Sequence, residues 1–191
     1  GKDGREMPNG VAASLEGRGD VAKLRGDLDG AEALYRESLD IAREIGNRER
    51  QSSALNNLGV IARQRGDLDG AEALYREALD LTREFVNLAN ESATLNGLGR
   101  IARKRGDYEE AERLHNEALN VDRKLGDRLG ESQELARLGR IALDRGDHDF
   151  AEKLYRDSVR IVKELGAPFD QWLIDNGYTE PDAEWDFPPK E

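Results

Sequence analysis

Few side chains in this sequence have the types and spacing that catalysis or metal binding would need. The chain of 191 residues contains no cysteine, which excludes disulfides, thiolate zinc sites and a cysteine nucleophile. Its two histidines, His115 and His148, are far apart in sequence, and neither has the spacing of a metal motif. No phosphate-binding loop, dinucleotide fingerprint or nucleophile elbow occurs. The sequence therefore predicts a protein that is not an enzyme and has no cofactor or metal site.

The chemistry that the sequence does favour is recognition of carboxylates. Between residues 92 and 105, Arg100, Arg103 and Lys104 occur with no acidic residue. Arginine binds carboxylates through paired hydrogen bonds, and asparagine offers both a donor and an acceptor to a peptide backbone. Binding of an acidic ligand is one interpretation of this segment. A solvated, arginine-rich face without a ligand is the other.

The elements that position these residues follow from an internal repeat with a step of 40 residues. The tripeptide Arg-Gly-Asp begins at residues 25, 65, 105 and 145, and the surrounding leucine, glycine and alanine positions keep the same register. Apolar residues in each repeat have the spacing of two helices. The tripeptide glycine is expected to end the first helix, and the aspartate to cap the second. Because the tripeptide forms a hairpin turn in every repeat, it is not an adhesion motif.

Recurring small residues indicate how the helices of one repeat pack. A mid-helix glycine such as Gly59 costs about 1 kcal/mol relative to alanine, so close helix approach should compensate for it. We expect this glycine, with Ala62 and Ala71, to bring the two helices of a hairpin together. Leucine and tyrosine side chains, such as Leu74 and Tyr75, are then expected to fill the layer shared with the next repeat.

This pattern resembles the tetratricopeptide repeat. The family pattern has leucine-glycine in the first helix and alanine followed by an aromatic residue in the second, and Leu58-Gly59, Ala71 and Tyr75 match it. The period of 40 residues, with Arg83 at the usual proline position, is similar to the extended branch found in kinesin light chains and LGN-type scaffold proteins. The resemblance implies an all-α solenoid of about four helix-turn-helix repeats, forming a right-handed superhelix with a C-terminal capping helix.

The register divides the chain into segments. Residues 1–11 are expected to be an N-terminal extension, and the repeats fill residues 12–166. In strict register the four repeats run 12–51, 52–91, 92–131 and 132–171. A helix over residues 167–178 is expected to cap the fourth repeat, and an acidic tail follows at 179–191. The first repeat has Arg18 where the others have leucine, as expected for a terminal repeat whose outer face meets water.

The formal net charge of −11 is distributed unevenly. The first-helix segments 52–65, 92–105 and 132–145 sum to +7, the second-helix segments 28–45, 68–85, 108–125 and 148–165 to −8, and residues 167–191 to −6. In tetratricopeptide arrays the first helices line the concave groove, so the resemblance implies a basic groove in an acidic surface. The peptide-binding residues that it implies are Asn56, Asn57, Val60, Arg63, Asn96, Arg100, Arg103, Lys104, Arg137 and Arg140.

These observations predict a protein–protein interaction module, a scaffold that binds an extended acidic peptide in a basic groove. The net charge and the isoelectric point near 4.8 argue against non-specific binding of nucleic acid or anionic membranes. No apolar run approaches the length of a membrane span, so a cytoplasmic location is expected.

Two alternatives remain open at this stage. The acidic, aromatic tail complements the groove, so it could dock there in the same chain or in a second copy, giving autoinhibition or a homo-oligomer. Its candidate residues are Glu180, Asp182, Glu184, Trp185, Asp186 and Phe187. The second alternative is that the chain is the regulatory or sensor portion of a larger signalling or transcription protein.

Overall fold

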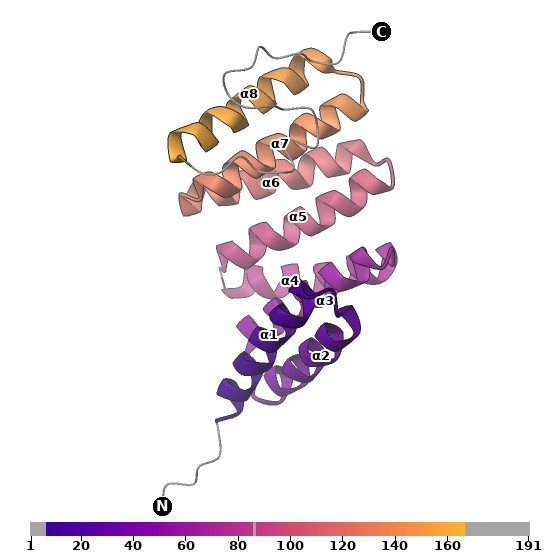
Figure 1. Ribbon diagram of the computed structural model, residues 1–191, viewed down its shortest axis with the longest axis vertical. Helices are drawn as coiled ribbons and strands as arrows, with labels where there is room; N and C mark the ends of the chain where they lie inside the picture. The colour runs from indigo at the N-terminus through magenta and orange to yellow at the C-terminus, as the bar shows by residue number, and fades with distance from the viewer. Residues whose placement is uncertain (1–6, 86, 167–191) are drawn as a thin grey trace, which may run out of the picture. The chain divides into compact units, whose positions relative to one another are not determined.

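The computed structural model describes residues 7–85 and 87–166, and these residues form eight α-helices and no strand (Figure 1). The helices are α1 (Pro8–Leu24), α2 (Leu28–Glu44), α3 (Arg48–Gln64), α4 (Leu68–Phe85), α5 (Leu88–Lys104), α6 (Tyr108–Leu125), α7 (Arg128–Asp144) and α8 (His148–Leu165). Odd-numbered helices are the first helices of the four repeats, and even-numbered helices are the second. The chain forms two compact parts, residues 1–101 and 102–191, called here the N-terminal and C-terminal parts.

The turn inside each repeat forms as predicted. The four tripeptide glycines have φ between 79° and 85°, in the left-handed region that glycine adopts without strain. The aspartate that follows accepts a hydrogen bond from the backbone N–H three residues later, at 2.9 Å for both Asp27 and Asp67. This bond satisfies one of the free N–H groups at the start of the second helix. The Arg-Gly-Asp tripeptide is therefore a helix stop followed by a helix start.

The first helices begin earlier than the predicted segments, because a second capping residue also recurs every 40 residues. The side chain of Asn47 accepts a hydrogen bond from the Arg50 N–H at 3.1 Å, and that of Asp127 accepts one from the Gly130 N–H at 2.9 Å. The helices α3 and α7 consequently start directly after these caps. Helix α1 starts at Pro8, inside the range expected to be an N-terminal extension.

The mid-helix glycines make room for the tyrosines of the same hairpin. A Cβ atom added at Gly59 would lie 2.8 Å from the Tyr75 ring, and one at Gly19 would lie 2.6 Å from the Tyr35 ring. Both rings are buried. The expected close approach within a hairpin is confirmed. The tyrosine, expected in the layer shared with the next repeat, fills the space inside its own hairpin as well.

Apolar layers join consecutive hairpins within each part. In the N-terminal part, α2 packs on α3 and links the α1–α2 hairpin to the α3–α4 hairpin (Figure 1). The main residues of this layer are Ala31, Tyr35, Leu39, Leu55, Leu58 and Ile61. In the C-terminal part, α7 packs on both α6 and α8. These layers fix the direction in which the remaining faces of the first helices point.

Two expected segments lie outside the described residues. They are the capping helix at 167–178 and the acidic tail at 179–191. The self-docking residues proposed for the tail lie outside them too, so self-association and autoinhibition stay predictions.

Candidate peptide-binding site

The predicted peptide-binding residues lie on the first helices, on faces turned away from the apolar layers. On α3, Asn56, Val60 and Arg63 have the spacing of one helix face, and all three are partly exposed. We call this face of the first helices the inner face. The N-terminal part carries Asn56, Asn57, Val60, Arg63, Asn96 and Arg100 on it, and the C-terminal part carries Arg103, Lys104, Arg137 and Arg140.

In the N-terminal part, the Tyr75 ring lies between α3 and α5, near Arg63 and Arg100. A Cβ added at Gly97 of α5 would lie 2.5 Å from the Tyr75 ring, and one at Gly59 of α3 would lie 2.8 Å from it, so the ring lies between α3 and α5. Burial raises the pKa of the Tyr75 hydroxyl, and this rise is partly offset by the hydrogen bond from Arg63 and by the charges of Arg63 and Arg100. Two guanidinium groups therefore lie near one hydroxyl, which suits a carboxylate ligand.

Arg63 also has hydrogen-bonding capacity that the fold does not use. Its Nε atom is buried and has no hydrogen-bond partner in the part of the chain that the structure describes. Buried donors without a partner are rare, because losing the hydrogen bond to water costs about 1–3 kcal/mol. A ligand oxygen at this position would satisfy the donor.

A second polar group joins α1 to α3 on the inner face. The Lys23 ammonium group donates to the Asn57 side-chain oxygen at 2.9 Å and to Asp20 at 3.0 Å. Asp20 also accepts a hydrogen bond from the Tyr35 hydroxyl at 2.6 Å. Burial would raise the pKa of Asp20, but the hydrogen bonds from Tyr35 and Lys23 outweigh it and lower the pKa. Sequence reasoning missed Lys23 and Asp20, because the charge sums left out the first helix of the first repeat.

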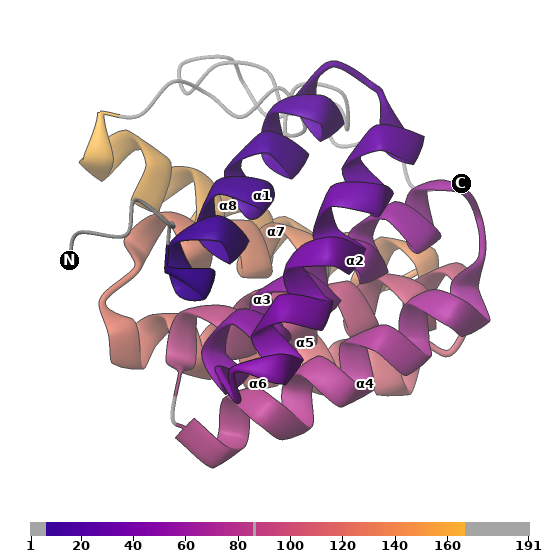
Figure 2. The ribbon, with the colours of Figure 1, turned by 90° about the horizontal axis from the view of Figure 1, so that it is seen from below.

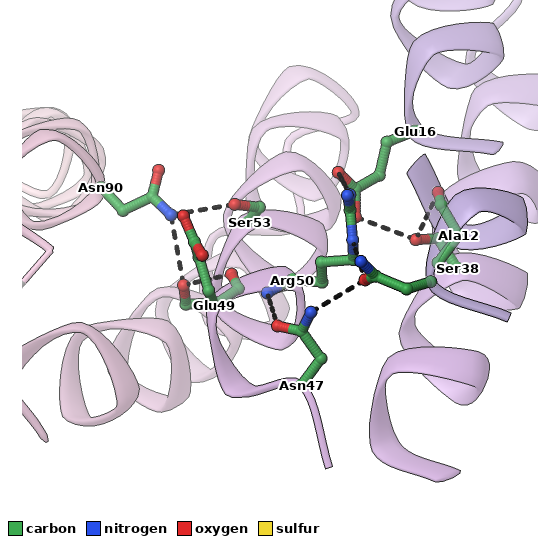
Figure 3. Close-up of polar contacts among 10 residues, drawn as sticks. Ala12, Glu16, Ser38, Asn47, Glu49, Arg50, Ser53 and Asn90 are labelled. Atoms are coloured by element: carbon green, nitrogen blue, oxygen red, sulfur yellow. Dashed lines mark hydrogen bonds and ion pairs between the residues drawn. The ribbon is translucent and has the colours of Figure 1, made fainter. Parts of the chain in front are cut away.

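A polar network near the N-terminal ends of α1 and α3 fixes the first two repeats to each other (Figure 3). Arg50 donates to Asn9 at 2.7 Å and to one carboxylate oxygen of Glu16 at 3.1 Å. The Ser38 hydroxyl of α2 lies 3.0 Å from the other oxygen of Glu16 and 3.1 Å from the Ala12 carbonyl oxygen. Three helices thus meet at one carboxylate, which holds the inner faces of α1 and α3 at a fixed angle.

Glu16 gives this network a pH dependence. Burial raises the pKa of its carboxyl above the ordinary value of 4.5, against the opposing effects of Ser38 and Arg50. The native state therefore holds this proton more tightly than the unfolded chain, and the contribution of Glu16 to stability falls as pH rises from 4.5 through its native pKa. We expect the Tm of the wild type minus that of Glu16→Gln to become more negative between about pH 4 and about pH 7. A difference that stays constant over this range would contradict the assignment.

Helix α5 is joined to α3 by similar contacts. The Asn90 amide donates to the Ser53 hydroxyl at 2.9 Å and to that of Ser52 at 3.2 Å (Figure 3). The Thr94 hydroxyl lies 3.4 Å from the side-chain oxygen of Asn56. The side-chain oxygens of Asn56 and Asn57 therefore contact side chains of neighbouring helices, Thr94 of α5 and Lys23 of α1. Both asparagines would consequently offer a peptide their amide N–H groups.

In the C-terminal part, acidic residues partly neutralise the predicted basic face. Arg103 and Arg140 both donate to Asp144, at 2.6 and 3.2 Å. Arg137 donates to Glu134 at 3.2 Å. The absence of acids within residues 92–105 did not leave Arg103 unpaired, because α7 supplies Asp144. Lys104 is exposed at the end of α5.

His115 is a buried packing residue, with a partner that sequence reasoning missed. Its Nδ1 atom lies 2.7 Å from Oε2 of Glu134, and the two side chains are 1% and 4% exposed. The residues equivalent to Glu134 in the second and third repeats are Ala54 and Thr94. The smaller ring of histidine is thus matched by a larger residue opposite it.

The arginine of the tripeptide joins consecutive repeats on their outer side. Arg65 donates to Asp29 and Glu32 of α2. Arg145 donates to Glu112 of α6 at 2.7 Å. These two arginines therefore bind the second helix of the preceding repeat.

The described residues show neither a metal site nor a membrane span. No cluster of three or more His, Cys, Asp and Glu side chains within residues 7–85 and 87–166 could hold a metal ion. In the same ranges, no helix is long and apolar enough to cross a membrane. What the described surface offers is a set of hydrogen-bond donors on the inner face.

Comparison with known families identifies the repeat. The tetratricopeptide repeat profile matches residues 10–84 and 90–164. The chain belongs to the tetratricopeptide repeat family. The match confirms the predicted family and the fold class of all-α helical repeats. The closer similarity to kinesin light chains and LGN-type scaffolds stays a prediction, and a search of curated proteins finds no match.

Several solved structures share this tetratricopeptide fold. BtubC (BKLC) from P. vanneervenii has a TM-score of 0.75 and 22% identity, with coverage of 98% of this chain and 73% of that chain. Aspartyl phosphate phosphatase F from Bacillus subtilis has a TM-score of 0.79 and 13% identity, with 85% and 43% covered. The Rap conjugation gene regulator of plasmid pLS20, solved in complex with the Phr* peptide, has a TM-score of 0.76 and 17% identity, with 85% and 44% covered. At these identities the similarity shows the fold alone.

Proposed function

We propose that this tetratricopeptide protein is a protein–protein interaction module that binds an extended, acidic peptide segment on its inner face. The observation that carries the proposal is the position of Arg63 and Arg100 near the Tyr75 hydroxyl, with the Arg63 Nε atom buried and without a partner in the described residues. A peptide carboxylate at this point would accept charge-assisted hydrogen bonds, which are roughly twice as strong as neutral ones.

The other residues of the inner face have supporting roles. The amide groups of Asn56 and Asn57 would donate to backbone carbonyls of the peptide, and Val60 would contact an apolar side chain between them. In the C-terminal part, Lys104 would add an exposed cation. Arg103, Arg137 and Arg140 would bind acidic side chains less strongly, because Asp144 and Glu134 already share their charge.

The family and its structural neighbours support a peptide or protein as the ligand. The Rap regulator of plasmid pLS20 was solved with a bound peptide, and it shares the fold of this chain. We extend peptide binding to this protein, together with a cytoplasmic location and a role without catalysis. The acidic character of the ligand rests on the residues of the inner face alone.

Selection from a displayed random-peptide library tests this function. We expect the full chain to enrich peptides rich in Asp and Glu. Their affinity should fall as salt is added, because the Debye length shrinks from about 10 Å at 0.1 M to about 3 Å at 1 M. Enrichment of basic or purely apolar peptides, or affinities independent of salt, would contradict the proposal.

A further inference from the structure

The outer face of the first hairpin has the residues of an interface between repeats, yet no described helix covers it. In Figure 2, α1 and α2 lie nearest the reader. A cavity of about 510 Å³ lies between α1 and α2, and its lining includes Gly17, Arg18, Val21, Arg25 and Leu34. We call these five residues the end face. All of them belong to the N-terminal part.

The apolar residues of the end face are covered wherever the repeat has a predecessor. Val21 is 47% exposed, whereas the equivalent Ile61 of α3 is 1% exposed. Leu34 corresponds to Leu74, which packs against the apolar layer between the first two repeats. Within residues 7–85 and 87–166, no helix covers the end face as α2 covers α3.

A cleft between the first two repeats contains the same residue positions as the end face, together with the helix that packs opposite them. A cleft of about 410 Å³ lies between α2, α3 and α4. One of its walls includes Ile61, Arg65 and Leu74. In the 40-residue register these three residues correspond to Val21, Arg25 and Leu34 of the end face. The other wall is α2, which contributes Glu32 and Leu39 among others. The end face thus repeats one wall of a cleft whose opposite wall is a second helix.

The arginine of the end face also indicates that a helix with acidic residues would pack there. Arg65 donates to Asp29 and Glu32 of the preceding second helix, and Arg145 donates to Glu112 of its own predecessor. Arg25 is the tripeptide arginine of the first repeat, and its side chain forms no hydrogen bond or ion pair within the described residues. An acidic residue on an incoming helix would complete the same pair.

Gly17 adds a recess of matching shape. In the third repeat the equivalent glycine, Gly97, is where the Tyr75 ring of the preceding second helix packs, with an added Cβ only 2.5 Å from the ring. An added Cβ at Gly17 would meet nothing within 4 Å. The end face has space for an aromatic ring at the position where Gly97 receives Tyr75.

We propose that the end face binds an amphipathic helix of a partner protein that reproduces the residue pattern of α2. That pattern is a small residue followed directly by Glu, an aromatic residue three positions later and Leu four positions after that, as in Ala31, Glu32, Tyr35 and Leu39. The Glu pairs with Arg25, the aromatic ring enters the recess at Gly17, and Leu covers Val21. This surface is separate from the inner face, so the proposal does not depend on the proposed function.

A second copy of this chain does not supply the helix. Its last second helix, α8, carries this pattern at Ala151, Glu152 and Tyr155, with Val159 in place of the Leu. The apolar members of that stripe are already buried, with exposures of 0%, 0% and 5% for Ala151, Tyr155 and Val159. A helix from another protein therefore fits the end face better than α8 of a neighbouring copy.

The test uses a fluorescein-labelled synthetic peptide with the sequence of residues 27–46, which is the helix that covers the equivalent face of α3. Fluorescence anisotropy with the full chain should show saturable binding. Arg25→Glu should weaken this binding at least tenfold, and a peptide carrying Asp29→Lys and Glu32→Lys should recover it. Lys124→Glu is the matched control, because it makes the same charge change near the C-terminal end of α6, and it should leave the affinity unchanged.

Three results would overturn the proposal. The first is no binding of the 27–46 peptide, and the second is equal affinity for the wild type and Arg25→Glu. The third is Arg25-dependent binding of a peptide with the sequence of residues 179–191, which would make the chain's own tail the occupant of the end face. Failure here would leave peptide binding at the inner face untouched, because neither Arg63 nor Arg100 is altered.

Discussion

Replacing Gly97 by alanine is expected to destabilise the protein by about 1–3 kcal/mol, the usual effect of overpacking a core. The added Cβ would lie 2.5 Å from Cζ of Tyr75 and 2.7 and 2.8 Å from its two Cε atoms. These atoms belong to a rigid ring that is 1% exposed and that Gly59 meets from the other helix. Because the ring has no space to move, the helices must separate. Urea unfolding of the full chain measures the loss.

Gly17 is the matched control for this substitution. It has the same position in the first repeat, but a Cβ there would meet nothing within 4 Å. Gly17→Ala should therefore raise stability by up to about 1 kcal/mol, through helix propensity alone. Effects of the same sign and size at Gly17 and Gly97 would contradict the assigned packing of Tyr75.

Replacing His115 by alanine is expected to cost about 2–5 kcal/mol, because it removes a buried ring and leaves a buried polar partner without its hydrogen bond. The substitution removes the hydrogen bond of 2.7 Å to the buried Glu134 carboxylate and leaves a cavity between α6 and α7. His115→Tyr alone should also destabilise the protein, because the larger ring meets Glu134. Urea unfolding at neutral pH measures both variants.

The double variant His115→Tyr, Glu134→Ala tests the cause of these losses. It recreates the pair formed by Tyr35 and Ala54 between the first two repeats, where both residues belong to one apolar layer. We therefore expect it to recover most of the stability that His115→Tyr loses. If the changes in unfolding free energy of the two single variants simply add in the double variant, His115 and Glu134 are not coupled. In that case the size of residue 115 does not determine which residue fits opposite it.

The turns and second helices could be predicted closely from the sequence. The segments 68–85, 108–125 and 148–165 are the observed bounds of α4, α6 and α8. The Arg-Gly-Asp tripeptide made this accurate, because glycine in the left-handed conformation and a capping aspartate mark both sides of one turn. The starts of the first helices were missed, because the cap is Asn47, Asn87 or Asp127 in successive repeats and is not part of a recurring tripeptide.

The position of the inner face could be predicted from the sequence, but the pairing of its cations with acidic residues of neighbouring helices could not. Helical spacing places Asn56, Val60 and Arg63 on one face whatever the packing. The partners of these positions lie about one repeat away and vary in identity, as Asp144 does beside Arg103. Charge sums over single helices therefore cannot tell a cation that is open to a ligand from one that a neighbouring helix has neutralised.

The central claim is that Arg63 and Arg100 bind a carboxylate of an acidic peptide, and the affinity of a library-selected acidic peptide for three variants tests it most directly. Arg63→Gln and Arg100→Glu should each weaken binding at least tenfold, because a hydrogen bond to a charged group contributes about 1.5–3 kcal/mol. Arg76→Glu on α4 is the control, since Arg76 pairs with Glu72 on a second helix. Affinities that fall for the first two variants and stay unchanged for Arg76→Glu are the predicted result, whereas equal affinities for the wild type and all three variants would contradict the claim.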